Sequence, residues 1–246
     1  MKVAKYIKNY VVKSYEVNAH GFLRLLTLLN FLQDIASEHA SVIGLGFDDC
    51  KNKGVAWVGA NYYIKIIRFP TIGEHFSIET WPAETKLWGA VRDFEVKDEK
   101  GNIIIFATSM WVLVDAIKHR PVMLKKYFPE YKVINERVME HDFANIIFPQ
   151  GQKKEEIYKV RFDDIDVNKH VNNAIYCVWA SESIDNDYLV KHVPEELEIC
   201  FKKEALYGEF VAVETLRVEN ESFHLITNKD NQKELAICRM KWRELH

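Results

Sequence analysis

The sequence predicts an α+β protein made of two similar units, each combining one long helix with an antiparallel sheet. Three observations predict it: a repeated segment, an apolar stretch at helical spacing in each half, and alternating strand-like runs after each stretch. The repeated segment covers residues 68–80 and residues 203–215, and each copy has a basic strand end, a Gly-Glu turn and an alternating strand. The order of elements therefore occurs twice along the chain.

The first unit is predicted to span residues 1–130. It begins with residues 11–17 and continues in a helix over residues 23–40, whose leucines recur along one side. Strand-like runs follow, and residues 98–102 are typical of a hairpin turn. A helix that buries an apolar side needs a sheet to cover it, so the helix and these strands form one layered unit. The predicted strands are residues 55–67, 76–81, 89–96 and 103–114.

The second unit is predicted over residues 155–246, with a helix over residues 174–190 and a hairpin turn at residues 228–232. Residues 131–154 are interpreted as the connection, because the periodicity weakens there. This stretch lacks the Gly/Ser-rich composition of a flexible tether, so we expect one compact molecule. The predicted strands of this unit are residues 198–203, 209–218, 224–228 and 235–243.

Composition narrows the class of protein. The chain has 246 residues, is 48% hydrophobic and carries a formal charge of −3, which favours neither nucleic acid nor an anionic membrane as partner. No apolar run reaches the roughly 18 residues of a membrane span, and the N-terminus has no secretory signal, so we expect a cytoplasmic protein. The four cysteines lack disulfide or zinc spacing; we expect reduced thiols, with Cys177 a buried apolar residue, and no metal or cofactor.

The most informative local feature is a polar stretch at residues 166–173. In an extended backbone, Asp166, Asn168 and His170 would project to one face, directly before a predicted helix that two asparagines can cap. Unpaired N–H groups at a helix N-terminus can hold a developing oxyanion, which suits a thioester carbonyl. The alternative is a polar loop whose Asp and Asn cap turns and whose His is solvated.

The stretch at residues 164–173, followed by Tyr176 and Trp179, resembles the plant and bacterial acyl-[acyl carrier protein] thioesterases. The resemblance covers about residues 11–242 and implies a tandem (double) hotdog fold, in which two helix-in-sheet units share one continuous sheet. The first unit would hold the acyl-chain pocket, and the second unit the catalytic residues. Further segments that resemble the family are residues 14–17, 29–34, 54–58, 69–74, 78–81 and 92–94.

Carried over by position, the resemblance implies Asp166, Asn168 and His170 as catalytic residues, joined by Glu204. The family's cysteine after this carboxylate is Ala205 here, so a cysteine nucleophile of the papain type cannot act at that position. In the internal repeat Glu204 corresponds to Phe69. A carboxylate at an otherwise apolar position would have its pKa raised by burial, as a general base requires; the alternative is a solvated Glu paired with Lys202 or Lys203.

The resemblance implies hydrolysis of a fatty acyl thioester carried by acyl carrier protein. Glu204 would activate water and His170 would transfer protons, while Asn168 and helix N–H groups would stabilise the thioester oxygen and Asp166 would orient the trio. Direct attack by a carboxylate, giving an anhydride, stays open. The predicted chain-contacting residues are Leu25, Leu29, Trp57, Trp88 and Trp111. A basic patch for the acidic carrier is predicted from Lys153, Lys154, Lys159, Arg161, Lys202 and Lys203.

Two other functions compete with this prediction. One is another hotdog enzyme, such as an acyl-CoA thioesterase or a dehydratase. The other is a non-catalytic module that binds acyl thioesters, although the sequence carries no basic helix-turn-helix pattern that a sensor would use. A monomer and a homodimer are both compatible with the sequence, because a tandem hotdog already contains the pairing that single hotdogs obtain by dimerising.

Overall fold

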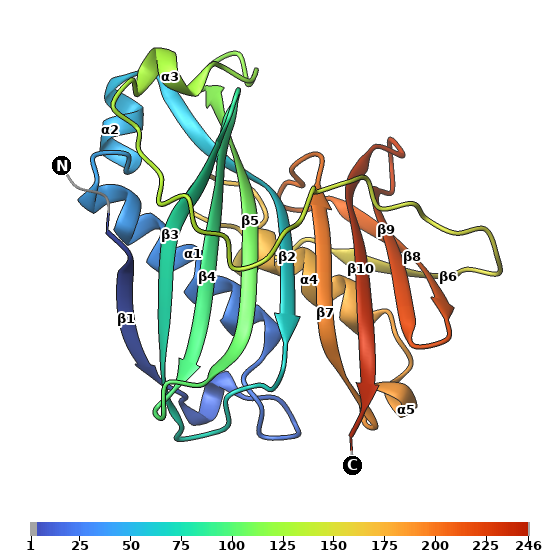
Figure 1. The fold of residues 1–246 in the computed structure, drawn as a ribbon. Helices are drawn as coiled ribbons and strands as arrows, with labels where there is room; N and C mark the ends of the chain where they lie inside the picture. The colour runs from blue at the N-terminus through green and yellow to red at the C-terminus, as the bar shows by residue number, and fades with distance from the viewer. Residues whose placement is uncertain (1–3, 246) are drawn as a thin grey trace. The chain divides into compact units, whose positions relative to one another are not determined.

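The computed structural model describes residues 4–245, and the chain divides into two compact units that meet in sequence between Phe143 and Ala144 (Figure 1). Residues 1–3, the start of the predicted first unit, lie outside the described residues. Within the described chain, each unit contributes five strands and one principal helix. The two predicted helix-and-sheet units are confirmed.

In the first unit the strands follow the order β1-β3-β4-β5-β2, and all neighbours are antiparallel. Helix α1 crosses one face of this sheet (Figure 1) and buries an apolar stripe that includes Leu28, Leu32 and Ile35, as its helical periodicity predicts. A 3₁₀ turn at Ser14–Glu16 precedes it. The elements are β1 (Tyr6–Val11), α1 (Leu25–Val42), α2 (Phe47–Asn52), β2 (Val55–Ile66), β3 (His75–Lys86), β4 (Gly89–Asp98), β5 (Ile103–Asp115) and α3 (Leu124–Tyr127).

In the second unit the strands follow the order β6-β8-β9-β10-β7, again antiparallel throughout, which is the order of the first unit repeated. A 3₁₀ turn at Phe162–Asp164 precedes its principal helix α4, as in the first unit. The duplication therefore extends to topology, as a tandem hotdog requires. The elements are β6 (Lys154–Lys159), α4 (Asn173–Glu182), α5 (Asn186–Leu189), β7 (His192–Phe201), β8 (Phe210–Val218), β9 (Glu221–Asn228) and β10 (Glu234–Glu244).

The repeated Gly-Glu segment forms the same turn in both units. Gly73 and Gly208 have φ values of 79° and 83°, a backbone region that L-residues with a side chain rarely adopt. The glutamate after each glycine closes the turn: the Glu74 carboxylate accepts from the Thr71 N–H at 3.0 Å, and that of Glu209 from the Leu206 N–H at 2.8 Å. Both residues of the motif thus have a structural reason to recur.

Several predicted elements are corrected by the structure. The helix predicted over residues 174–190 ends at Glu182, and a separate short helix follows. Strand β7 begins at His192, six residues before its predicted start, and the strands β1 and β6 that open each unit were not predicted. The strand after each helix does not pair with the next strand in sequence, because β2 pairs with β5 and β7 pairs with β10.

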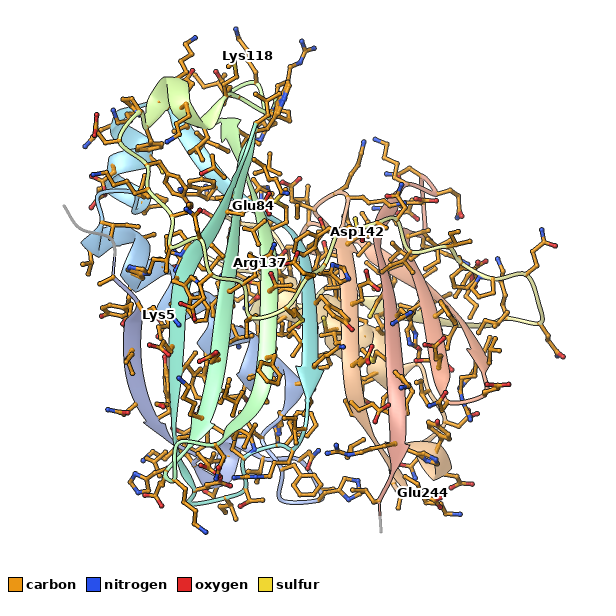
Figure 2. The ribbon with its side chains drawn as sticks, viewed as in Figure 1. Lys5, Glu84, Lys118, Arg137, Asp142 and Glu244 are labelled. Atoms are coloured by element: carbon orange, nitrogen blue, oxygen red, sulfur yellow. The ribbon has the colours of Figure 1, made fainter. Side chains whose placement is uncertain are left out.

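Part of the connection predicted at residues 131–154 packs on the first unit. The Val138 N–H and the Arg137 guanidinium both donate to the buried Asp93 carboxylate, at 2.8 Å and 3.0 Å. Figure 2 shows Arg137 close to Glu84, to which it also donates at 3.2 Å. The Ile134 N–H donates to a carbonyl of β3. These bonds fix the segment across the sheet face opposite α1 (Figure 1).

Within residues 4–245, no helix is both long and apolar enough to cross a membrane. Cys177 is fully buried on α4, and burial raises the pKa of its thiol, which favours the unreactive protonated form. The prediction of a buried apolar cysteine is therefore confirmed.

Candidate active site

The polar stretch of the second unit forms a closed turn. The Asp166 N–H donates to the His170 carbonyl at 2.8 Å, the Lys169 N–H donates back to the Asp166 carbonyl at 3.0 Å, and Lys169 has a φ of 68°. Ile165 and Val171 form an isolated bridge on either side. The prediction of an extended backbone is therefore wrong, because an Asp side chain that bonds to the backbone two residues on favours a turn instead.

The Asp166 carboxylate holds this turn together. It accepts from the backbone N–H groups of Asn168, at 2.8 Å, and His170, at 3.4 Å, and from the Asn168 side-chain amide at 3.3 Å. Asn168 is exposed and His170 is half-buried. Asp166 thus positions the other two residues through the backbone, while the imidazole makes no hydrogen bond to another described side chain.

The turn leads directly into the N-terminus of α4. Asn172 is the N-cap, and its side chain accepts from the Ala174 N–H at 3.0 Å, which confirms the predicted asparagine cap. The Asn172 N–H donates to the carbonyl of Asp164, and the buried Asp164 carboxylate accepts from the Arg161 guanidinium at 2.7 Å. Arg161 therefore anchors the approach to the helix.

Glu204 lies on the segment beside this turn. The Val171 N–H donates to the Ala205 carbonyl at 3.1 Å, so the residues after His170 and after Glu204 are bonded to each other. Tyr176 of α4 reaches the same segment: its hydroxyl accepts from the Ala205 N–H at 2.9 Å and donates to the Lys203 carbonyl at 3.4 Å. The structure therefore brings Asp166, Asn168, His170 and Glu204 to one end of α4.

Glu204 differs from its sequence-based prediction. Its side chain is exposed, although its counterpart Phe69 is buried. It is also not paired with a neighbouring lysine: Lys202 bonds to Glu234, and no ion pair joins Glu204 to any described residue. The carboxylate is open to solvent beside the polar turn.

The first unit contains a cavity that sequence reasoning located only in part. It is open to solvent on one side and spans about 480 Å³ when the solvent at its mouth is included; Trp57 and Trp111 line it, whereas Leu25, Leu29 and Trp88 do not. Arg92 lines it as well and was not predicted; the signal was a charged residue on an otherwise apolar strand start, residues 89–91. Other lining residues are Ala36, Ser37, Ala40, Leu45, Ala90 and Tyr131.

Arg92 is a buried cation with neutral partners. Its guanidinium donates to His39 Nδ1 at 3.0 Å and to the Thr80 hydroxyl at 3.2 Å, and it forms no ion pair with any carboxylate among residues 4–245. Because a guanidinium only donates, Nδ1 of His39 must accept, and its proton lies on Nε2. Burial, followed by the charge of Arg92, lowers the pKa of His39 to about 4.

Most of the predicted basic patch is already neutralised within the second unit. Lys153 pairs with Glu214 at 2.6 Å and Lys154 with Asp185 at 2.9 Å, while Lys202 and Arg161 have the partners given above. Lys159 and Lys203 have no carboxylate partner in the described part of the chain. The charge available to attract an acidic partner is therefore smaller than the sequence suggests.

The two duplicated helix-and-sheet units define a tandem hotdog protein. Within residues 4–245, only the second unit carries the polar turn and the solvent-exposed carboxylate of Glu204 near the N-terminus of its helix. The model of the acyl-ACP thioesterase N-terminal domain matches residues 3–131, and that of the acyl-ACP thioesterase C-terminal domain matches residues 148–244. The chain belongs to the acyl-ACP thioesterase family.

Individual relatives agree with this assignment. The chain is 27% identical to a chloroplastic palmitoyl-acyl carrier protein thioesterase of Gossypium hirsutum over 97% of its own length and 64% of that protein, so it spans less than two thirds of this plant relative. Two solved structures share its fold at 21% identity. An acyl-ACP thioesterase from Bacteroides thetaiotaomicron has a TM-score of 0.89, with 97% of this chain and 98% of that chain covered. The 12:0-ACP thioesterase from Umbellularia californica has 0.87, with 98% of each covered.

Proposed function

We propose that this chain hydrolyses the thioester between a fatty acyl chain and the phosphopantetheine arm of acyl carrier protein, releasing a fatty acid and the free thiol. Family membership supports the reaction class. The single observation that carries the proposal is the bond from the Val171 N–H to the Ala205 carbonyl, because it joins the segment of Glu204 to the polar turn at the start of α4. A carboxylate and an imidazole on two adjacent segments are suited to moving protons from and to water.

In this proposal Glu204 takes a proton from water as the water oxygen attacks the thioester carbon. The C–S bond then breaks, and the departing sulfur takes up a proton, for which His170 is the donor on the adjacent turn. Glu204 is exposed, so water can reach its carboxylate. Direct attack by the Glu204 carboxylate would instead give an anhydride, which water would then hydrolyse.

The carbonyl oxygen gains negative charge during attack and needs hydrogen-bond donors. At the start of α4 the Ala174 N–H is taken by the Asn172 cap, and the Ile175 N–H donates to the Asn172 carbonyl. The donors at this end include the Asn173 N–H and the second amide hydrogen of Asn168. We assign oxyanion stabilisation to this pair, with Asp166 holding Asn168 in place.

The acyl chain is assigned to the cavity of the first unit, whose walls include Trp57 and Trp111. Aromatic and small apolar side chains suit an aliphatic chain. The acidic carrier protein would use the uncompensated charges of Lys159 and Lys203. A cytoplasmic location and the choice between monomer and homodimer stay predictions; cell fractionation and solution scattering test them.

The experiment is hydrolysis of a panel of acyl carrier protein thioesters of about eight to eighteen carbons, beside the matching CoA esters and an enoyl thioester. We expect turnover of the carrier-protein esters that is lost in Glu204→Ala and in His170→Ala, with folding retained. Turnover of CoA esters alone would identify an acyl-CoA thioesterase, and hydration of the enoyl ester a dehydratase. Binding without turnover by folded protein would contradict the hydrolase and favour a binding module.

A further inference from the structure

Tyr176 bonds through its hydroxyl to the backbone of the residue before Glu204 and of the residue after it. Its side chain is fully buried on α4, and its one hydroxyl accepts from the N–H of Ala205 and donates to the carbonyl of Lys203. These are the two residues that flank Glu204. The Glu204 side chain itself bonds to no described residue, so its position is set by its backbone alone.

The first unit contains the same segment without this device. The Leu23 N–H donates to the Pro70 carbonyl at 2.8 Å, as the Val171 N–H does to Ala205, and the Arg68 N–H donates to the Ile104 carbonyl, as that of Lys203 does to Leu235. Counted from the two helix N-caps, Leu28 stands where Tyr176 stands. The chain path is therefore shared, and the side chains beneath it differ.

The difference follows from one N–H group. Pro70 has no N–H, so its burial leaves no donor without a partner, and the buried residue at the position of Tyr176 is the apolar Leu28. Ala205 has an N–H, is fully buried, and finds its hydrogen-bond partner in the Tyr176 hydroxyl. A buried N–H without a partner is unfavourable, so the segment would shift to reach water or another acceptor if the hydroxyl were removed.

We propose that Tyr176 is a positioning residue for Glu204: its hydroxyl fixes the backbone of residues 203–205 so that the carboxylate faces the polar turn. This inference rests on the proposed function of Glu204. Burial raises the pKa of Tyr176, and the neighbouring carboxylates of Glu204, Glu209 and Asp166 add to the effect, so the phenol keeps its proton and continues to donate to Lys203.

Tyr176→Phe isolates the hydroxyl, because the ring keeps its edge contacts with Trp179 and Phe201 at centroid distances of 5.3 Å and 5.7 Å. We expect kcat to fall about 10- to 100-fold, since displacement of a reacting group by about 1 Å has an effect of this size. KM should change by less than about threefold, because the residue does not touch substrate. The matched control is Tyr158→Phe, which removes a hydroxyl from another tyrosine stacked on Trp179 and should leave kcat unchanged.

A second pair of variants copies the first unit. Ala205→Pro alone should lose activity, because the proline ring meets the Tyr176 hydroxyl where the N–H now donates. Tyr176→Leu combined with Ala205→Pro reproduces Leu28 and Pro70 of the first unit, and it removes the N–H donor together with its hydroxyl acceptor. The kcat of this double variant should be at least about tenfold higher than that of Tyr176→Leu alone. This pair also decides the matter if Tyr176→Phe is too unstable to assay.

A third arm separates this inference from the proposed function. In a Glu204→Ala background, Tyr176→Phe should cause no further loss in single-turnover rate, because its only route to the reaction has been removed. Wild-type kcat in folded Tyr176→Phe, or a double variant no better than the single ones, would overturn the positioning role while leaving Glu204 in place. Wild-type activity in Glu204→Ala would instead contradict the proposed role of Glu204, and the positioning role of Tyr176 would be contradicted with it.

Discussion

Residues 17–24 of the first unit and residues 165–172 of the second fold into the same hydrogen-bonded turn with different side chains. Asn18 bonds to the backbone of Phe22 as Asp166 bonds to that of His170, and Gly21 takes the left-handed φ that Lys169 takes in the second unit. The turn geometry is therefore a property of the hotdog unit. It is not by itself evidence of chemistry.

What differs is the pair of side chains that the turn and the neighbouring segment present. In the first unit Phe22 and Phe69 stack with their ring centroids 6.4 Å apart. In the second unit the equivalent positions carry His170 and Glu204. One copy uses the pair for packing, and the other carries two titratable groups there, which is the pattern expected when a duplicated unit gives up stability for function.

The largest expected effect comes from giving the second unit the side chains of the first. His170→Phe combined with Glu204→Phe should lower kcat at least about a thousandfold, because the imidazole and carboxylate are both lost. The melting temperature should hold or rise, since an aromatic pair contributes about 0.5–1.5 kcal/mol. Turnover assays and thermal melts measure both quantities.

The control for this variant is His20→Ala, which removes the imidazole from the turn of the first unit. Its activity should stay within about twofold of wild type, because His20 is a half-buried residue of the first unit and lies outside the candidate active site. Surviving turnover in the double phenylalanine variant, or equal losses in the two turns, would contradict the division of roles.

The next effect concerns one buried histidine in each unit. Burial lowers the pKa of His39 to about 4 and that of His224 to about 3, both below the ordinary 6.5. The unfolded chain therefore binds more protons between pH 6.5 and these values, so stability is full above pH 6.5 and falls as the pH drops. By pH 5 each histidine should lower the free energy of unfolding by about 2 kcal/mol, while ordinary carboxylates are still ionised.

Denaturant unfolding between pH 7 and pH 5 measures this loss. His39→Gln and His224→Gln should each remove about half of the pH dependence, and the double variant nearly all of it. A free energy of unfolding that is flat over this range in the wild type would contradict buried neutral histidines in both units.

A smaller effect on chain-length preference is expected from Arg92, which lines the cavity of the first unit and has a different residue at the equivalent position of the second unit. In strand register, Arg92 corresponds to Ser222, whose hydroxyl bonds to both His224 and the Trp242 indole at 2.8 Å in a closed network. Arg92→Met replaces a charge in the cavity wall by an apolar side chain. The kcat/KM ratio of longer to shorter acyl chains should rise about tenfold, because more of a chain end can be buried.

Trp88→Phe is the control for this change, because Trp88 was predicted to contact the chain but does not line the cavity. Its chain-length profile should match the wild type. An unchanged chain-length profile in Arg92→Met would contradict the assignment of the acyl chain to this cavity.

The smallest effect concerns charge on the second unit. Lys159→Ala should raise KM for acyl carrier protein about threefold at low salt and not at high salt, because it removes an uncompensated surface charge. Lys153→Ala should have a smaller effect, since Lys153 is already paired with Glu214. Equal, salt-independent effects would contradict electrostatic docking at this surface.

The duplicated fold was predictable because its signals are local and occur twice. The Gly-Glu turn needs a glycine for its φ and a carboxylate for its closure, and both are visible in the sequence. Strand β1 was missed although its residues alternate between exposed and half-buried, because a short edge strand carries few apolar residues. The pairing of β2 with β5 depends on contacts distant in sequence, which periodicity does not report.

The catalytic residues stay a prediction, and their geometry was not predictable from the sequence. The fold brings the four predicted polar residues to one region, but Asp166 bonds to the backbone of its own segment, which forms a turn in place of the expected extended backbone. The apolar counterpart Phe69 favoured a buried Glu204, and the alternative was a solvated Glu paired with a lysine; the segment leaves this position open to solvent, without such a pair among the described residues. The roles of Arg92 and Tyr176 depend on which partners the fold brings to them, and neither spacing nor composition reveals those partners.

The most direct test of the central claim is the single-turnover rate of Glu204→Gln on an acyl carrier protein thioester that the wild type hydrolyses. Gln keeps the size of the side chain and removes its basicity. The account predicts a rate at least about a hundredfold slower, with acyl carrier protein binding and melting temperature unchanged. A Glu204→Gln rate equal to that of the wild type would contradict it.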